Sequence, residues 1–417
     1  MVPAETHVLA PEETALQACE REIGDFLVRF GLEQDDLGAL LEDLIAQLRQ
    51  AGFALRRAMV GSDDLHPVIG GISYRWRPEA GVEESVWERT FDIESSDSWL
   101  RSPLFALIES KAGELRRRLN HEYRRGEFPL LDELQDEGCT DYIAFASSFG
   151  ERARLGEVEG VFCSFQTDRP GGFTDGEVEF LRRLMPPLAL TYKAIITVRT
   201  ARALMTTYLG KDPGERVIAG SIDRGRAVSV PAVLWYSDLQ GFTKIADAAD
   251  GPVLLALLND YAEAVVAAVQ QHEGEVLKFM GDGVFAMFPR GGGGTEALCQ
   301  RAIDAAVSLR DAVATLNERR SRAGLPTCGF YVALHYGDVL YGNIGSPARL
   351  DFTVVGPAVN ETARIEAMCR SLDQWLVVSS AFAEAAGADR HRLVSLGRYA
   401  LRGVRRPQEL FTIDPEN

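Results

Sequence analysis

The sequence lacks the cysteine patterns that mark disulfide-stapled or zinc-binding proteins. It contains no C-x-x-C pair, and no cluster of histidines lies near any cysteine. The six cysteines are dispersed along the chain as Cys19, Cys139, Cys163, Cys299, Cys328 and Cys369. Dispersed cysteines are typical of free, buried thiols in a reducing compartment, so we expect neither disulfides nor zinc.

The chain also lacks a surplus of positive charge. Its 44 lysines and arginines stand against 61 aspartates and glutamates, which gives a net charge of −17 over 417 residues. General binders of nucleic acids or anionic membranes need a positive footprint, so we expect neither as a partner. A small phosphorylated ligand is still compatible, because metal ions bridge acidic residues and phosphates.

Export and membrane signals are missing from the sequence as well. The first residues, "MVPAETHVLAPEETAL", show neither the basic nor the apolar region of a signal peptide. No uninterrupted apolar stretch reaches the ~20 residues that span a bilayer. We therefore expect a cytoplasmic protein that has no membrane partner.

The first 170 residues predict a mixed module that begins with helices. Apolar residues recur at helical spacing within 13–57. Strands are predicted at 67–77, 141–150 and 160–168, and a strongly charged helix is predicted at 104–128. This order of strands and helices favours an α/β sensor-type module with an antiparallel sheet.

A long helix is predicted to follow this module. It covers 171–210, where Thr174 and Glu177 have the spacing of a capping box. The Pro-Pro pair at 186–187 predicts a kink. A dimerising linker and an ordinary packed helix explain the pattern equally well. A glycine-rich connector at 210–227 separates this helix from the second half.

The second half reads as an α+β domain with a ferredoxin-like β-α-β-β-α-β core. The predicted elements are a strand at 232–237, a helix at 251–272, a hairpin at 275–288, a helix at 295–322, paired strands at 328–345 and a strand and helix at 349–368. Further strands follow to the end of the chain.

Two acidic residues of this half each end a strand at a turn. Asp238 follows the apolar run "AVLWY", and Asp282 sits between two glycines at the tip of the predicted hairpin. In a β-α-β-β sheet these turns are neighbours, so both carboxylates can meet at one edge. With the backbone carbonyl of Leu239 they would suit Mg²⁺ or Mn²⁺. Taken singly, either acid is better explained by capping its own turn.

The residues around these acids resemble the catalytic domain of class III nucleotidyl cyclases, the adenylate and guanylate cyclases. The segments "YSDLQGFT", "KFMGDGVFAMF", "HYGDVLYGNIG" and "RLDFTVVGPAVNETARIE" carry the resemblance in order. The resemblance covers roughly residues 229–414. The resemblance implies a homodimer with two equivalent sites at the seam, where one subunit supplies the metal-binding acids and the other supplies the remaining residues.

Residue by residue, the resemblance implies a role for each matched position. Asp238 and Asp282 would hold two Mg²⁺ or Mn²⁺ ions per site, with help from the carbonyl of Leu239. Asn360 would orient the ribose, and Arg364 would meet the negative charge that grows on the α-phosphoryl group. The i to i+4 spacing puts Asn360 and Arg364 on one helix face.

The same resemblance assigns the substrate-binding residues. Lys278 and Thr353 stand at the positions that select the base, and they favour ATP over GTP because they match the donor and acceptor pattern of adenine. A threonine here accompanies bicarbonate-responsive members of the family, which makes such sensitivity a hypothesis. The other residues assigned to the substrate are Phe242, Thr243, the triphosphate-binding Arg349, and Arg402, for which Arg405 is a competitor.

Several alternatives stay open or fall away. A guanylate or pyrimidine nucleotide cyclase would keep the mechanism, and a catalytically silent nucleotide-binding or dimerisation module would lose it. The segment "GSIDRGRA" at 220–227 lacks the lysine of a P-loop. The turn "FMGDGVF" differs from the Gly-Gly-acid-acid-Phe turn of diguanylate cyclases.

The N-terminal half resembles a GAF domain, a small-molecule sensor, most clearly in "GVFCSFQTDRPGGFTDGEVEFLRRLMPPLAL". A small-molecule effector is therefore a predicted partner, with a purely structural dimerisation domain as the rival. His66 and His121 as haem ligands, and "RRRLNHEYRR" as an anion site, are weaker alternatives to ordinary packed or solvated residues. The predicted boundaries are 1–57 for N-terminal helices, 58–174 for the sensor domain, 175–228 for a helical linker and hinge, and 229–417 for the catalytic domain.

Overall fold

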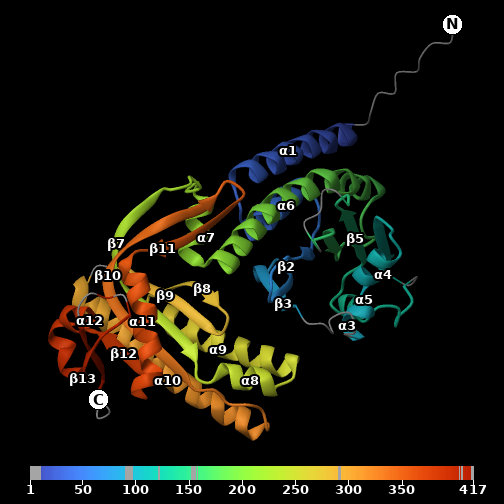
Figure 1. Ribbon diagram of the computed structural model, residues 1–417. Coiled ribbons are helices and arrows are strands. Elements are labelled where there is room, and N and C mark those ends of the chain that lie inside the picture. Colours follow the sequence, from blue (N-terminus) through green and yellow to red (C-terminus); the bar gives the residue numbers. More distant parts are fainter. Residues whose placement is uncertain are drawn as a thin grey trace. The chain divides into compact units, whose positions relative to one another are not determined.

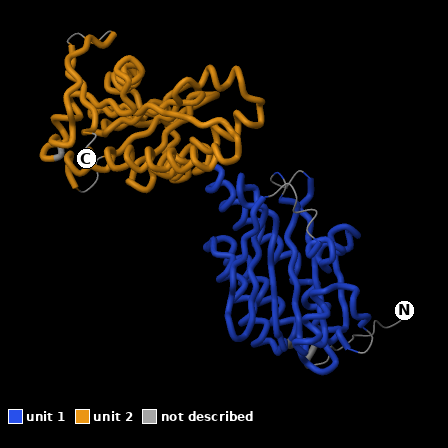
Figure 2. The backbone as a smooth tube through the Cα atoms, turned by 90° about the horizontal axis from the view of Figure 1, so that it is seen from below, with its two compact units in different colours: residues 1–204 blue, residues 205–417 orange. Residues whose placement is uncertain are grey.

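The computed structural model describes residues 11–89, 97–120, 123–151, 156, 158–289, 293–402, 404 and 407–414. The chain divides into two compact units, residues 1–204 and 205–417, which are coloured separately in Figure 2. Each unit contains helices and an extended sheet, so the predicted mixed α+β character is confirmed. The six cysteines are free and all but Cys19 are buried, as the sequence predicts.

Unit 1 is built on a six-stranded antiparallel sheet with the order β3-β2-β1-β6-β5-β4. Its elements are α1 (Pro11–Glu33), α2 (Leu37–Gln50), β1 (Arg57–Asp63), β2 (Ile69–Arg77), β3 (Gly81–Glu88), α3 (Asp97–Leu100), α4 (Pro103–Glu109), β4 (Glu114–Arg118), α5 (Pro129–Asp136), β5 (Asp141–Ser148), β6 (Gly160–Thr167) and α6 (Asp175–Leu209). The three strands predicted from the sequence correspond to β2, β5 and β6. Strands β1, β3 and β4 were not predicted.

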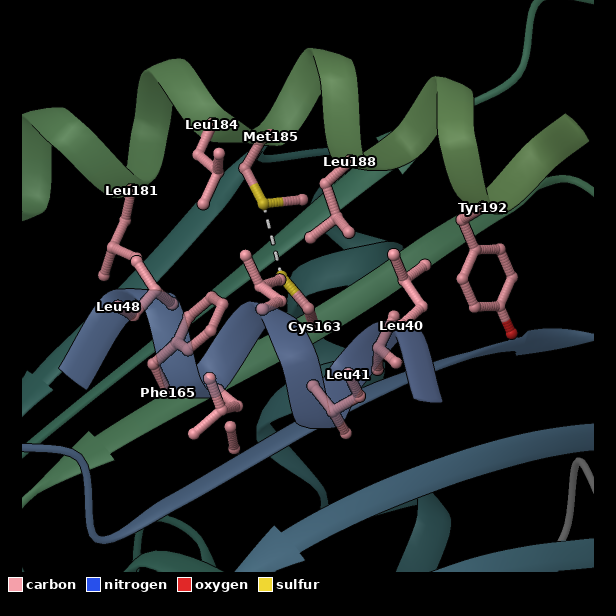
Figure 3. Packing of buried hydrophobic residues seen from close by; sticks show 14 of the residues in the cluster. Leu40, Leu41, Leu48, Cys163, Phe165, Leu181, Leu184, Met185, Leu188 and Tyr192 are labelled. Atoms are coloured by element: carbon pink, nitrogen blue, oxygen red, sulfur yellow. Dashed lines mark hydrogen bonds between the residues drawn. The ribbon is translucent and has the colours of Figure 1, made fainter. Parts of the chain in front are cut away.

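The main core of unit 1 lies between one sheet face and helices α1, α2 and α6. Figure 3 shows side chains of α2, α6 and β6 that meet there: Leu40, Leu41, Leu48, Cys163, Phe165, Leu181, Leu184, Met185, Leu188 and Tyr192. A smaller core on the other face packs α4 and α5 against β5 and β6. The sheet is therefore covered on both faces over part of its width.

The start of α6 confirms the predicted capping box. The backbone N–H of Thr174 donates to Glu177 Oε2 at 2.8 Å, and the N–H of Glu177 donates to Thr174 Oγ1 at 3.2 Å. The helix continues through Pro186 and Pro187 to Leu209. Thirteen of its side chains are buried, so this helix is packed along much of its length.

The predicted charged helix at 104–128 is wrong. Helix α4 ends at Glu109, and Glu114–Arg118 forms the edge strand β4, which pairs with β5. The reason is tertiary, because Arg116 on β4 donates to the carboxylate of the fully buried Asp141 at 2.7 Å and to the carbonyl of Phe173 at 2.7 Å. An anion site in this arginine-rich segment loses its basis there, since Arg116 is already paired. His121 lies outside the described residues.

Unit 2 contains an eight-stranded sheet with the order β13-β14-β12-β10-β7-β9-β8, to which β11 adds by pairing with β10. Its elements are α7 (Lys211–Ile218), β7 (Ala227–Leu239), α8 (Phe242–Ala248), α9 (Gly251–Gln271), β8 (Glu275–Met280), β9 (Gly283–Pro289), α10 (Gly294–Arg322), β10 (Phe330–Ser346), β11 (Arg349–Val355), α11 (Pro357–Leu372), β12 (Leu376–Ser379), α12 (Ser380–Ala385), the 3₁₀ helix η2 (Gly387–Arg392), β13 (Leu393–Tyr399) and β14 (Gln408–Ile413). The order β7-α9-β8-β9-α10-β10 confirms the predicted core.

Helices cover both faces of this sheet. Helices α9, α10 and α12 pack on one face, while α11 and the β10–β11 hairpin build the cores on the other. The connector predicted at 210–227 contains helix α7, which lies beside the hairpin in Figure 1, and Tyr341 donates from its hydroxyl to Asp212 at 2.7 Å. Residues 328–345, predicted as paired strands, belong to one strand because β10 pairs with β7 along its length.

Helix α9 is the one helix in the described part of the chain that is long and apolar enough to cross a membrane by length and composition. An 18-residue window has a mean hydropathy of 1.5. Asn259, Asp260 and Glu263 interrupt its apolar residues. Leu257, Val265 and three other side chains are buried in the core of unit 2, which accounts for part of this apolar character.

The buried His335 makes stability depend on pH. Its Nδ1 lies 2.9 Å from Ser379 Oγ, and burial lowers the pKa of the imidazole, against a smaller effect of Glu361. A histidine with a lowered folded pKa stabilises the protein above its unfolded pKa of about 6.5, and that stability is lost as pH falls. We expect the melting temperature to drop between pH 7 and pH 5, and to drop less in His335→Asn.

Thermal unfolding followed by circular dichroism would measure this effect, with the exposed His391→Asn as the matched control. Equal pH slopes for all three proteins would contradict the assignment.

Candidate functional site at the end of strand β7

The two predicted metal-binding acids lie on turns that need glycine. Asp238 is the penultimate residue of β7, and helix α8 starts after Gly241, whose φ is +67°. Asp282 lies in the two-residue turn between β8 and β9, directly after Gly281 with a φ of +69°. Side chains beyond hydrogen disfavour this left-handed region, so these glycines allow each chain segment to turn directly beside its acid.

The sheet brings these two turns together. Strands β7 and β9 are antiparallel neighbours, and Ser237 lies opposite Val284. Asp238 is partly buried, and this burial, together with a hydrogen bond to Asp282 and the charge of Asp282, raises the pKa of Asp238 to about 7. The backbone N–H of Leu239 donates to Asp238 Oδ1 at 3.1 Å, which acts in the opposite direction.

The chemistry of this donor set fits a divalent cation. Two carboxylates that oppose each other electrostatically are stabilised by a positive ion, and oxygen is the donor that Mg²⁺ prefers. The described residues contain no group of three or more His, Cys, Asp or Glu side chains arranged around a metal. Mg²⁺ commonly takes one or two carboxylates and completes its shell with water and phosphate oxygens, so a carboxylate pair is sufficient.

The two predicted base selectors lie on strands that the fold brings close together. Lys278 on β8 places its Nζ 3.4 Å from Asp351 Oδ2 on β11, two residues before Thr353. The side chain of Thr353 is buried, and its Oγ1 has no hydrogen-bond partner among the residues that the structure describes. A buried hydroxyl without a partner costs free energy, so Thr353 Oγ1 is available to a ligand group that can satisfy it.

Asn360 and Arg364 lie one turn apart on α11 and line the same cavity. The cavity measures about 500 Å³ and is lined by Gly356, Pro357, Asn360, Glu361, Arg364 and Val404. Neither Asn360 nor Arg364 has a side-chain hydrogen bond or ion pair to any described residue. Asp238 and Asp282 are not among the residues that line this cavity.

The remaining predicted substrate residues are spread over several elements. Phe242 begins α8 and packs partly into the core, whereas the neighbouring Thr243 is exposed. Arg349 is the exposed first residue of β11, and Arg402 is exposed after β13. Arg405 lies outside the described residues, so its competition with Arg402 stays open.

Sequence reasoning missed two residues of this region. Asp351 contacts Lys278. Because residues two apart on a strand point to the same face, the position of Asp351 two residues before Thr353 could have indicated it. Glu366 lies on α11, where burial raises its pKa and the charge of Asp282 adds to this effect. Only the folded chain shows that this helix approaches the acid pair.

Comparison with known proteins gives one family match, to "Adenylate and Guanylate cyclase catalytic domain", over residues 228–415. The adenylate cyclase of Anabaena cylindrica is 30% identical over 154 residues, which are 36% of this chain and 30% of that protein. Adenylate cyclase 1 of Rhizobium meliloti is 27% identical over 146 residues, which are 35% of this chain and 22% of that protein. The chain thus spans less than a third of the length of these curated relatives.

Among solved structures, the adenylyl cyclase CyaB from P. aeruginosa superposes with a TM-score of 0.41 and 20% identity. The superposition covers 45% of this chain and 96% of that one.

Proposed function

Because residues 228–415 form a catalytic domain of the adenylate and guanylate cyclase family, we propose that this protein is an adenylate cyclase. It converts ATP to 3′,5′-cyclic AMP and pyrophosphate at sites shared by two copies of the chain. The observation that carries the proposal is the convergence of Asp238 and Asp282 at one end of the sheet. A purely structural domain would have no reason to oppose two carboxylates in a partly buried place.

The acid pair, Asp238 and Asp282, and the α11 pair, Asn360 and Arg364, have different roles in the proposed reaction. Two Mg²⁺ or Mn²⁺ ions held by Asp238, Asp282 and the Leu239 carbonyl would lower the pKa of the ribose 3′-hydroxyl and neutralise phosphate charge. The amide of Asn360 orients the ribose. The guanidinium of Arg364, which has no partner among the described residues, donates to the α-phosphoryl oxygens as their negative charge grows.

Base selection rests on Lys278 and Thr353. The ammonium of Lys278 donates to the adenine N1 acceptor, and the unpartnered Thr353 hydroxyl meets the exocyclic amine. Asp351 holds Lys278 until the base arrives. Guanine presents the opposite donor and acceptor pattern in this region, so the site favours ATP. Arg349, with Arg402 nearer the C-terminus, supplies positive charge for the triphosphate.

In a homodimer, Asp238 and Asp282 of one subunit and Asn360 and Arg364 of the other can form one active site; we call these two pairs the half-sites. The acids and the Asn/Arg pair occur in one sequence, but the cavity lined by Asn360 and Arg364 is not lined by Asp238 or Asp282. Helix α6 also carries an exposed stripe with the alternating spacing of four and three residues that is typical of a coiled-coil seam. Its members are Ala194, Val198, Ala201, Met205 and Tyr208.

Unit 1 has the role of a regulatory sensor in this proposal. Its antiparallel sheet is covered by helices on both faces, and α6 continues from it to Leu209, at the start of unit 2. The motif in residues 160–190 is the sequence support for a GAF-like fold. A small-molecule effector held by this unit would act on the dimer through the α6 helices.

A nucleotide panel tests substrate choice. Purified protein is incubated with ATP, GTP, CTP or UTP and Mn²⁺ or Mg²⁺, and the products are identified by mass. We expect cyclic AMP as the main product, and we expect Lys278→Glu to lower kcat/KM for ATP by about tenfold or more, because a site that hydrogen-bonds a base rejects mismatched groups strongly.

The matched control is Lys244→Glu, the same charge change at an exposed position of α8. Cyclic GMP or a cyclic pyrimidine nucleotide as the main product would refute the base assignment and leave the acid pair untouched.

A further inference from the structure

Unit 1 carries a row of arginines that the proposed cyclase chemistry does not use. Strands β1 and β2 are antiparallel with Ala58 opposite Trp76, so the next position outward places Arg57 opposite Arg77. Ala58 and Trp76 point into the main core. Because side chains alternate along a strand, Arg57 and Arg77 point to the other face of the sheet.

A third arginine joins them on this face. Arg75 precedes Arg77 by two residues and lies opposite Met59, so its side chain shares the face with Arg57. The Nε of Arg75 is buried and has no hydrogen-bond partner. Burial lowers the pKa of Arg57, and the charges of Arg75 and Arg77 lower it further, which shows that the three guanidinium groups lie near one another.

The acids nearby form no ion pair with these arginines: Glu79, which the charge of Arg77 also reaches, is paired with Arg56. Glu83 lies opposite Arg75 on β3, and Glu137 follows α5 close enough to act on Arg57. Neither forms an ion pair with the three arginines, and within the described residues none of the three has an ion-pair partner. Like charges directly opposite each other across two strands destabilise a sheet. We therefore expect this cluster of positive charge to have a function, such as binding an anion.

A buried amide completes the site. Gln166 on β6 lies directly opposite Arg57 and is 1% exposed. Its Nε2 donates to Ser164 Oγ at 2.9 Å, while its Oε1 accepts no hydrogen bond from the described part of the chain. Buried polar atoms are almost always paired, so the amide oxygen of Gln166, beside three guanidinium groups, is an acceptor that a ligand with a hydrogen-bond donor would satisfy.

We propose that Arg57, Arg75, Arg77 and Gln166 form a binding site for a small organic anion that carries a phosphate or carboxylate group. Guanidinium groups bind both groups through paired hydrogen bonds, and the Gln166 amide would bind a hydroxyl or amine next to the anionic group. The site deepens the proposed sensor role of unit 1. Its test reads binding and melting temperature rather than cyclic nucleotide formation, so it stands or fails separately from the cyclase activity.

The experiment measures the melting temperature of the full-length protein with glycerol 3-phosphate, malate or chloride at constant ionic strength. The Arg364→Ala variant is the background, so that unit 2 contributes less to any phosphate response. We expect glycerol 3-phosphate or malate, but not chloride, to raise the melting temperature of unit 1 by about 3 °C at concentrations well above Kd. A response to glycerol 3-phosphate identifies a phosphate ligand, and a response to malate identifies a carboxylate ligand.

The variants Arg77→Gln and Arg57→Gln make the test specific. Each should raise the melting temperature without anion, because it removes the like-charge opposition, and each should abolish the anion response. Arg29→Gln removes the same charge from the exposed surface of α1, which packs on the opposite face of the sheet, and should change neither. A lower anion-free melting temperature in both variants, an unchanged response in them, or no response of the parent to either organic anion would overturn the proposal.

Discussion

Replacing Asp238 by asparagine will reduce cyclic AMP formation by about 100-fold or more. The substitution keeps the shape of the side chain and removes the negative charge that we propose binds a divalent cation, whose stabilisation of phosphate charge is worth several kcal/mol. Asp282→Asn should have a comparable effect, because the two carboxylates act on the same charge. Initial rates at saturating ATP over a range of Mn²⁺ concentrations measure the loss.

Although Asp238→Asn should remove activity, it should stabilise the metal-free protein. Burial and Asp282 raise the pKa of Asp238 to about 7, compared with an ordinary value near 3.9. Between these values the folded protein binds more protons than the unfolded chain, so its unfolding free energy falls as pH rises. Asp238→Asn removes this fall. We therefore expect the metal-free variant to melt at a higher temperature than the parent at pH 8.

The matched control is Asp247→Asn, an exposed acid on α8. It should retain activity and the parent melting temperature. A loss of activity together with a lower metal-free melting temperature in Asp238→Asn would mean that the carboxylate supports the fold rather than a cation, and would contradict the assignment.

The local geometry around the predicted site residues of unit 2 could be anticipated from the sequence because each part of it is local. Asp238 and Asp282 each sit in a short turn whose glycines are visible in the sequence, and the β-α-β-β order makes the two turns neighbours. The spacing of Asn360 and Arg364 follows from the helix alone. The sequence does not show which distant residues meet in the fold. One example is the contact of Lys278 with Asp351, which lies 73 residues away along the chain.

Unit 1 was less predictable because its features depend on strand register. Residues 114–118 contain three consecutive arginines and follow a helical segment, so local pattern favours a helix. Pairing with β5 and the buried Asp141 overrides that preference. Similarly, Arg57 and Arg77 lie opposite each other only because of the register of β1 and β2. A shift of one residue would turn the arginine side chains to the face of the sheet that carries the main core.

Two inactive variants mixed in one dimer should recover activity. Asp238→Asn damages the acid half-site, and Asn360→Ala damages the half-site on α11. In the proposed symmetric dimer each active site would combine the acids of one subunit with the α11 residues of the other. A heterodimer of the two variants therefore contains one site with both defects and one site with none.

The expected recovery can be given as a number. Random assembly of equal amounts makes half of the dimers heterodimers, and each carries one intact site of two, so activity should return to roughly a quarter of the parent value. Co-expression with two different affinity tags, followed by tandem purification, isolates the heterodimer, which should reach roughly half. Cyclic AMP formation by each purified species gives the measurement.

The control is the double variant, which carries both substitutions in one chain, co-expressed with the Asp238→Asn chain. Every dimer of this pair lacks an acid in both sites, so its activity should stay at the background level. Activity of the first pair that remains at this level, with dimers present, would show that each chain builds its site alone. The separation of the acid pair from the cavity of Asn360 and Arg364 would then require a rearrangement within one chain, because α11 would have to bring Arg364 to the acids of its own sheet.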